Sequence, residues 1–303
     1  KEDRYIHVGI AVYDRSDTFM ESYIRELEDK IGQTKILGKK VSYEIYDAEG
    51  IGSRQEKQLQ EMYAQDYDVM LVNLVEPASA ASVLTDAKDA DIPVILFNRE
   101  IDEKDLKISK NVWYVGTDAR AAGVMQGKLL KDLWKKQSRI LDWNGNGMLD
   151  YVLVEGEESH FDAIRRTSGF LETGAELPLN QKGNILAEWK RELAYEKFAA
   201  LDDEAVQNVE AVICNNDDMA LGVYDYYKEK NLKLPVIIGI NNSEEMHQKI
   251  MSGEMYGTID NKMEDQVMEI CRLMQAILKK DTGSYQKVWY STPKAIVKAE
   301  GTE

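Results

Sequence analysis

The feature that most constrains the fold is a regular alternation of short apolar runs with longer amphipathic stretches. YIHVGIAV (5–12) is rich in β-branched residues, and a helical pattern follows it from about 19 to 31. Strands that alternate with helices of this length indicate βαβ units, whose parallel sheets are covered by helices on both faces. Roughly five strands per half predict an α/β protein with two doubly wound parallel-sheet lobes, since a single eight-stranded barrel would leave strands over. The other expected strands are 41–48, 69–75, 94–98, 113–118, 151–157, 184–189, 211–217 and 236–242, and the other expected helices are 53–65, 79–90, 119–136, 162–174, 190–201 and one ending near 230.

Composition excludes several classes of partner. The formal charge of −16 would repel a phosphate backbone, so nucleic acid and anionic membranes are unfavourable partners. No apolar run approaches the ~20 residues of a membrane span. Cys214 and Cys271 are too few for a disulfide framework and are expected to be buried free thiols. No signal peptide is visible, so the chain is interpreted either as cytosolic or as a mature form without its leader.

Polar residues gather where the expected strands end, which is where open parallel sheets bind ligands. They occupy 14–17 and 98–100 in the first half, and 157–162, 215–218 and 241–242 in the second. Carboxylates, amides, an imidazole and a guanidinium suit the donor and acceptor pairs of a neutral polyhydroxyl compound. Aromatic rings can cover the apolar faces of a sugar, although Trp189 taken alone is more typical of a core residue than of a sugar platform.

A second motif, DWNGNGMLDY (142–151), resembles the first nine positions of a calcium-binding loop. Asp142, Asn144 and Asn146 fall at positions 1, 3 and 5, Met148 offers a carbonyl at 7, and Asp150 stands at 9. Position 12, which should be a bidentate glutamate, is a leucine within an apolar run. The motif alone therefore leaves two readings open, a metal site that takes its last ligand from elsewhere and a polar turn.

Several phrases together resemble the periplasmic glucose/galactose-binding proteins of bacterial sugar uptake and chemotaxis, which have the type I periplasmic-binding-protein fold. The resemblance covers nearly the whole chain and is weakest at 101–111, 174–185 and the last twenty residues. The phrases that carry it are VGIAVYDRSDTFM (8–20), VNLVEPASA (72–80), VILFNRE (94–100), WYVGTDARAAGVMQG (113–127), DWNGNGMLDYVLVEGEESHFDAIRRT (142–167), AVICNNDDMALG (211–222) and YGTIDN (256–261).

The resemblance implies a monosaccharide site with contacts from both lobes, in which Phe19 and Trp189 enclose a pyranose ring. At one position the chain departs from the family, because Asn241 replaces an aspartate and a charge-assisted bond is lost. This departure bears on which sugar is preferred and on affinity. The implied sugar-binding residues are Asp17, Phe19, Asn98, His160, Asp162, Arg166, Trp189, Asn216, Asn241 and Asn261.

The resemblance also implies structural Ca²⁺ bound by the 142–150 loop, with Glu210 as the remote glutamate. Asp150 and Glu210 each begin an expected strand, so both are expected at one edge of the second sheet, opposite the sugar residues. The implied ligands are Asp142, Asn144, Asn146, Met148, Asp150 and Glu210.

As a whole, the resemblance implies an extracytoplasmic solute-binding protein that delivers glucose or galactose to the permease of an ABC transporter. A monomer is expected, located in a periplasm or held at a cell surface as a lipoprotein, with a chemoreceptor as a further partner. The chain should cross between the lobes three times through a three-strand hinge. One lobe is then 1–116 plus 261–292, and the other, which carries the calcium loop, is 117–260 plus 293–303.

Other functions were weighed on the residues. A repressor of the same fold needs a helix-turn-helix before the first strand, where four residues precede Tyr5. A glycoside-acting enzyme would use Asp17 and Asp162 as its carboxylate pair. The first βα turn has no glycine for a dinucleotide site, and no nucleophile elbow is present for a hydrolase. A sugar-sensing receptor ectodomain remains an alternative with the same binding site.

Overall fold

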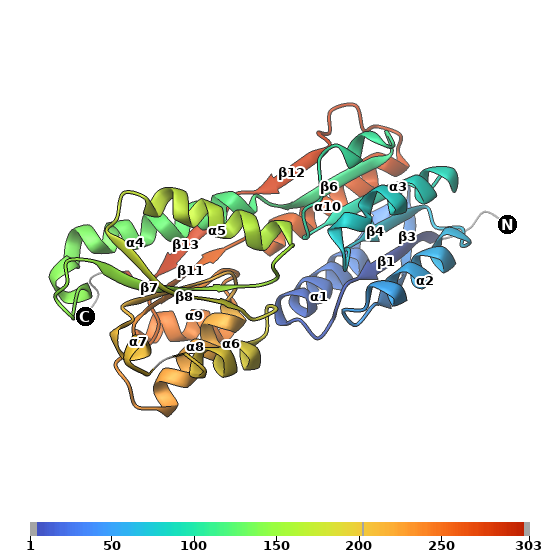
Figure 1. The fold of residues 1–303 in the computed structure, drawn as a ribbon. Coiled ribbons are helices and arrows are strands. Elements are labelled where there is room, and N and C mark those ends of the chain that lie inside the picture. Colours follow the sequence, from blue (N-terminus) through green and yellow to red (C-terminus); the bar gives the residue numbers. More distant parts are fainter. Residues whose placement is uncertain (1–4, 202, 300–303) are drawn as a thin grey trace. The chain divides into compact units, whose positions relative to one another are not determined.

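The chain divides into two compact α/β units, each with its own sheet (Figure 1). The structure is a computed structural model and describes residues 5–201 and 203–299. Unit 1 extends to Thr117 and resumes over Lys262–Ser291, and unit 2 comprises Asp118–Asn261 and the chain from Thr292. The backbone thus passes between the units three times, at positions that differ from the expected boundaries by one residue. Two units with largely parallel sheets confirm the predicted fold class.

Unit 1 is built on a seven-stranded sheet in the order β12-β6-β5-β4-β1-β3-β2. Its central strands are buried on both faces, as the continuous apolar runs of β4 and β5 require. Its strands are β1 (Tyr5–Val12), β2 (Lys35–Ile36), β3 (Lys39–Asp47), β4 (Val69–Val72), β5 (Val94–Phe97), β6 (Val112–Thr117) and β12 (Val288–Ser291). Its helices are α1 (Thr18–Gln33), α2 (Gly52–Tyr63), α3 (Ala80–Asp89) and α10 (Met263–Leu278), with short 3₁₀ turns η1 (Pro77–Ser79) and η2 (Asp105–Lys107).

Unit 2 is built on a six-stranded sheet in the order β13-β11-β10-β9-β7-β8. The pairings are parallel except at the edge, where β13 runs antiparallel to β11. Its strands are β7 (Leu149–Glu155), β8 (Leu179–Leu186), β9 (Ala211–Cys214), β10 (Val236–Ile238), β11 (Gly257–Asp260) and β13 (Lys294–Val297). Its helices are α4 (Ala119–Leu141), α5 (Phe161–Gly174), α6 (Arg191–Ala199), α7 (Asp203–Asn208), α8 (Asp217–Glu229) and α9 (Glu244–Ser252).

Helices α4 and α5 of unit 2 approach one another closely at two glycines. A Cβ added to Gly123 would lie 1.9 Å from the Arg166 carbonyl oxygen, and one added to Gly169 would lie 2.2 Å from that of Arg120. Because no side chain fits at either position, the helix backbones can touch. This contact fixes the position of α5, which carries several of the predicted sugar residues.

A small polar cluster in unit 1 lies where β6 and β12 end. The hydroxyls of Thr117 and Ser291 are 2.9 Å apart, and the Gln266 amide donates to both, at 2.7 and 3.1 Å. All three side chains are buried. The two strands therefore leave unit 1 from hydrogen-bonded positions.

Some elements differ from the sequence prediction. Helix α4 continues past 136 to Leu141, with Gln137 in a non-helical conformation (φ −139°). The run expected at 184–189 belongs to β8, which begins earlier and ends at Leu186. The strands β2, β11, β12 and β13 and the helices α7, α9 and α10 were not among the expected elements. These strands have only two to four residues, which is too short for an alternating pattern to stand out.

Both cysteines are buried free thiols, as predicted. Burial raises the pKa of the Cys214 thiol well above its ordinary value, and it raises the pKa of Cys271 to about 11. Within the described ranges, none of the helices has both the length and the apolar character of a membrane span.

Candidate functional site

The predicted sugar residues of unit 1 lie at the carboxyl ends of β1 and β5. Asp17 caps α1, its Oδ1 accepting from the Met20 N–H at 2.8 Å. Phe19, half-buried in the first turn, is backed by the edge of Tyr23 with ring centroids 6.0 Å apart. Asn98 directly follows β5 with a left-handed backbone (φ 66°), which asparagine tolerates better than most residues.

Residues that the sequence argument did not select connect these side chains. The Tyr13 hydroxyl donates to Asp17 Oδ2 at 2.5 Å, and the Arg99 guanidinium lies 3.6 Å from the centre of the Tyr13 ring. Asn73 accepts from the Tyr13 N–H at 3.0 Å and donates to Asn98 Oδ1 at 3.4 Å. Burial, and then the charge of Asp17, raise the pKa of Tyr13 well above its usual value, so the phenol remains a donor. Tyr13 and Asn73 could have been identified in the sequence by their position, because each directly follows a strand.

In unit 2, the turn after β7 brings together His160, Asp162 and Arg166. His160 caps α5, its Nδ1 accepting from the Asp162 N–H at 3.2 Å, so the neutral ring carries its proton on Nε2. Arg166 lies one helical turn beyond Asp162 and donates to the Asn215 carbonyl at 2.7 Å. All three side chains are less than a tenth exposed. A carboxylate, an imidazole and a guanidinium are therefore held in one buried corner of the unit.

Trp189 covers this corner from the turn between β8 and α6. Its indole stands edge-on to His160 at 5.7 Å, and the Arg166 guanidinium lies 5.5 Å from the ring centre. Its Nε1 donates to Glu157 Oε1 at 2.8 Å. Beneath the ring, a Cβ on Gly156 would lie only 2.2 Å from an indole carbon. The indole is thus fixed by hydrogen bonding and by packing, while the residue remains half-buried.

Three asparagines complete the predicted set of unit 2. Asn216 caps α8 through the Met219 N–H at 3.0 Å and donates to the Trp189 carbonyl at 3.1 Å. The Asn261 amide donates to Asn241 Oδ1 at 3.3 Å. Asn216 therefore joins the Trp189 corner directly, and Asn241 and Asn261 form a separate pair at the ends of β10 and β11.

The residues of the loop 142–150 also gather around one centre. Amide groups of Asn144 and Asn146 donate to Asp150 Oδ2 at 2.9 and 3.2 Å, and Asp142 accepts two backbone N–H groups of the loop. Glu210 accepts from the backbone N–H of Asp150 at 2.9 Å and of Asn144 at 3.3 Å. The remote glutamate and the loop are therefore in contact.

The donor chemistry of this loop fits Ca²⁺. Burial raises the pKa of Glu210, and the charges of Asp150 and Asp142 act in the same direction. A divalent cation would relieve that repulsion, and all the candidate ligand atoms are hard oxygens. The Asn144 and Asn146 amides would have to rotate to present oxygen, since in the structure their nitrogens face Asp150. Among the described residues, no three aspartate, glutamate, histidine or cysteine side chains already lie close enough together to hold a metal ion.

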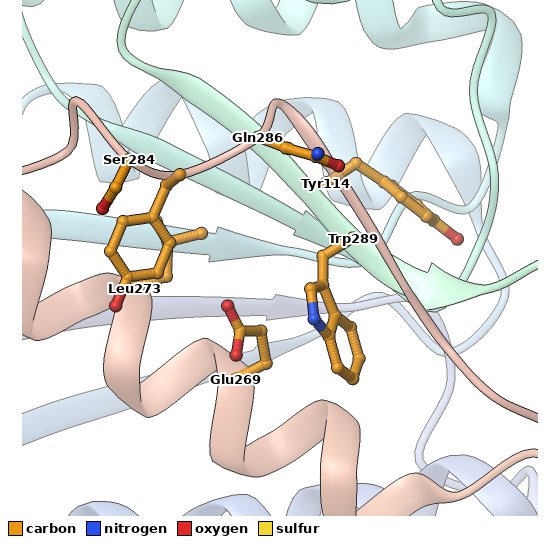
Figure 2. A pocket seen from close by; sticks show the side chains of 7 residues that line it. Tyr114, Glu269, Leu273, Ser284, Gln286 and Trp289 are labelled. Carbon is orange, nitrogen blue, oxygen red and sulfur yellow. The ribbon is translucent and has the colours of Figure 1, made fainter.

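A cavity of about 320 Å³ in unit 1 contains none of the predicted residues (Figure 2). Glu269 of α10 lies beside the Trp289 side chain, while the Tyr114 hydroxyl points away and donates to the Asn98 carbonyl at 3.0 Å. With a single carboxylate, this lining lacks the polar set that gathers at the strand ends. The full lining is Tyr114, Glu269, Leu273, Ser284, Tyr285, Gln286 and Trp289.

Comparison with known proteins gives one consistent result. The periplasmic binding protein domain family matches residues 8–282. The D-galactose/methyl-galactoside binding periplasmic protein MglB of Haemophilus influenzae is 31% identical, over 93% of this chain and 84% of its own length. The galactofuranose-binding protein YtfQ of Escherichia coli is 27% identical, over 79% and 74%.

A solved structure shows the same fold. The ABC transporter periplasmic solute binding protein of Actinobacillus succinogenes, solved with bound D-allose, superposes with a TM-score of 0.82 at 19% identity, covering 96% of this chain and 97% of its own. Sequence and fold thus agree: the chain belongs to the periplasmic binding protein domain family, as the resemblance implied.

Proposed function

We propose that this protein captures a monosaccharide outside the cytoplasm and delivers it to the permease of an ABC transporter. The observation that carries the proposal is the buried corner of unit 2, where Asp162, His160 and Arg166 meet the Trp189 indole. Vicinal hydroxyls need both acceptors and donors, and the apolar face of a pyranose needs a flat ring. Family membership and the named relatives support the same ligand class.

In the proposed complex both units contact one sugar. Asp17 and Asp162 accept hydrogen bonds from hydroxyls, and Arg166 donates. Phe19 and Trp189 are each half-buried and backed by their own unit, and each is proposed to cover an apolar face of the ring. The remaining contacts are proposed for Asn98, His160, Asn216, Asn241 and Asn261.

Glucose and galactose are the proposed ligands, and Asn241 is the residue that bears on the choice. The Haemophilus influenzae relative is named for binding D-galactose and methyl-galactoside. An amide at 241 offers a donor as well as an acceptor, whereas a carboxylate offers two acceptors with charge. Affinity for a hydroxyl that only donates should therefore be lower than with aspartate at this position.

We also propose that the loop 142–150, with Glu210, holds a structural Ca²⁺. Six oxygen-bearing positions match the coordination number of that ion, and burial together with the charges of Asp150 and Asp142 raises the pKa of Glu210, a rise that a bound cation would oppose. The loop precedes β7 and Glu210 precedes β9, while the sugar residues follow those strands. A strand of seven residues spans roughly 20 Å, so the ion would stabilise unit 2 without touching sugar.

A cell-surface lipoprotein is one proposed form of the protein.

The proposed activity is capture of the sugar, not catalysis. Asp17 is engaged by Tyr13 and by the α1 cap, and Asp162 lies beside a His160 whose Nδ1 accepts a hydrogen bond. Neither arrangement supplies a protonated general acid next to a free nucleophile. Incubation with aryl glycosides should release no product above the uncatalysed rate.

Isothermal titration calorimetry against a panel of hexoses and pentoses tests the proposal. We expect saturable heat at one site per chain for glucose or galactose, and weaker heat for their epimers. Absence of heat for every sugar in the panel, with the protein shown to be folded by circular dichroism, would overturn it. Co-purification with a detergent-solubilised permease tests delivery, and size-exclusion chromatography with light scattering tests the expected monomer.

A further inference from the structure

Asp217 is a buried carboxylate that contacts three segments next to the proposed sugar residues. It is the first residue of α8, directly after Asn216, and is 1% exposed. Its Oδ1 accepts from the Thr258 hydroxyl of β11 at 2.6 Å, and its Oδ2 accepts from the Ser243 N–H at 2.7 Å. Its own N–H donates to the Ile240 carbonyl at 2.9 Å. One side chain therefore joins α8, β11 and the loop after β10.

The loop after β10 adopts a backbone conformation that needs such support. Asn241 has φ 126° and Asn242 has φ 57°, both in a region that non-glycine residues rarely occupy. Such a conformation is strained and persists only where the surroundings hold it in place. The Asn241 N–H donates to the Ile259 carbonyl at 2.8 Å, and the Ser243 N–H is held by Asp217. The carboxylate thus fixes one end of the strained segment.

The carboxylate also has no room to move away. A Cβ on Gly239 would lie 2.2 Å from Asp217 Oδ1, so this oxygen packs directly on the glycine backbone. Both of its oxygens accept hydrogen bonds. Protonation of Oδ2 would set its O–H against the Ser243 N–H, which can only donate, and protonation of Oδ1 would require the Thr258 hydroxyl to turn from donor to acceptor. The ionised form is therefore the form that holds the loop.

We infer that Asp217 is a positioning residue that holds Asn241 ready for sugar, and that its protonation releases the loop and weakens sugar binding. The inference rests on the proposed function, because Asn241 matters here as a sugar contact. Asp217 itself does not touch sugar in this account. It acts through Ser243 and Thr258.

Several charged groups set the pH range of the effect. Burial raises the pKa of Asp217 to about 7, the hydrogen bonds from Thr258 and Ser243 oppose that rise, and the charge of Asp218 adds to it. The raised pKa means that the ionised, loop-holding form is present above about pH 7 and is lost as the pH falls below it. The other titratable groups on the packed elements are Cys214 of β9, Asp260 of β11, and Glu244, Glu245 and His247 of α9.

The test is the pH profile of sugar affinity in the wild type and in Asp217→Asn, measured by calorimetry from about pH 8.5 to 5.5. The amide loses one acceptor, so we expect Asp217→Asn to bind about tenfold more weakly at pH 8. The wild type should lose a similar factor between pH 8 and pH 6, and the variant should not. His160 is unchanged in both proteins, so it cannot produce a difference between their profiles. Asp218→Asn, the same change one residue further on, is the matched control: it should keep the wild-type affinity at pH 8, and the midpoint of its profile should move to lower pH, because the charge of Asp218 helps to raise the pKa of Asp217.

Thr258→Val gives an independent readout if Asp217→Asn folds poorly. It removes one hydrogen bond that favours the carboxylate, so the midpoint of the affinity profile should move to higher pH. A wild type that binds no sugar at pH 8 refutes the proposed function. Two results would refute the role of Asp217 and leave the proposed function standing. One is equal sugar affinity of the wild type at pH 8 and pH 6, and the other is a single pH profile shared by the wild type, Asp217→Asn and Thr258→Val.

Discussion

Replacement of Trp189 by alanine should weaken sugar binding by at least about thirtyfold. A tryptophan buries about 150–250 Å² when fully covered, and Trp189 is half-buried in the sugar-free structure. On the order of 80 Å² of indole is then left for a ligand to cover. At ~25 cal/mol per Å² this area is worth about 2 kcal/mol, or about thirtyfold in Kd.

A larger loss is expected if neighbouring side chains also shift. The indole contacts the His160 ring and the Arg166 guanidinium, and both would face a void after truncation. Their proposed hydrogen bonds to sugar would then be made from less fixed positions. Losses of this kind explain why a central aromatic residue often costs more than its area predicts.

Calorimetric titration at 20 °C gives the measurement, after circular dichroism has shown that the variant is folded. Trp289→Ala is the matched control, because Trp289 is also half-buried but lines the separate cavity of unit 1 (Figure 2). We expect the control to bind sugar as the wild type does. If Trp189→Ala retains wild-type affinity, or if Trp289→Ala loses it, sugar does not bind at the Trp189 corner.

Four further predictions follow from the same geometry. Chelator should lower the melting temperature by several degrees while leaving the Kd for sugar nearly unchanged. In Glu210→Gln, chelator should no longer change the melting temperature. An identical melting curve of the wild type with and without chelator would argue against a bound ion. Since the pKa of Glu210 is raised, the chelator effect should shrink as acid protonates this carboxyl. Gly156→Ala should displace the Trp189 indole and weaken sugar binding, whereas an unchanged Kd would show that the ring can move at no cost. Asn241→Asp should strengthen binding by roughly fivefold through a charge-assisted bond, a gain that calorimetry would show and that equal affinity would disprove. Small-angle scattering should show a smaller radius of gyration with saturating sugar, and a constant radius would exclude closure of two units on the ligand.

The sequence predicts most of the inner strands of both sheets, and the reason is burial; the exception is β11, a four-residue strand that lies next to the edge strand β13. Strands such as β4 and β9 are apolar at every position because helices cover both faces, so their signal is strong. Edge strands have no such signal: β12 and β13 were missed because each of their residues is partly exposed or polar. The ends of α4 and β8 were misjudged for the related reason that the last residues of an element bury little.

The sequence predicts where the candidate site lies, at the ends of strands, but not which of its side chains contact one another. Asn98 directly follows the apolar run of β5, and Asn216 is the second residue after that of β9, so their position marks them as candidates. Tyr13 directly follows β1 in the same way, but tyrosine at a strand end is also common in cores, and its link to Asp17 appears only when the turn is folded. The role of Asp217 likewise depends on Ser243 and Thr258, which lie 26 and 41 residues away in sequence.

The two buried cysteines have a practical consequence for measuring this protein. Cys214 and Cys271 are both buried with raised pKa values, so at neutral pH neither is a thiolate that a maleimide could reach. A cysteine introduced at an exposed position would then be the group that reacts, with no need to remove the native thiols first. An environment-sensitive dye placed in this way near Phe19 or Trp189 would report sugar binding as a change in fluorescence, which turns the natural chain into a ready scaffold for a reagentless sugar sensor.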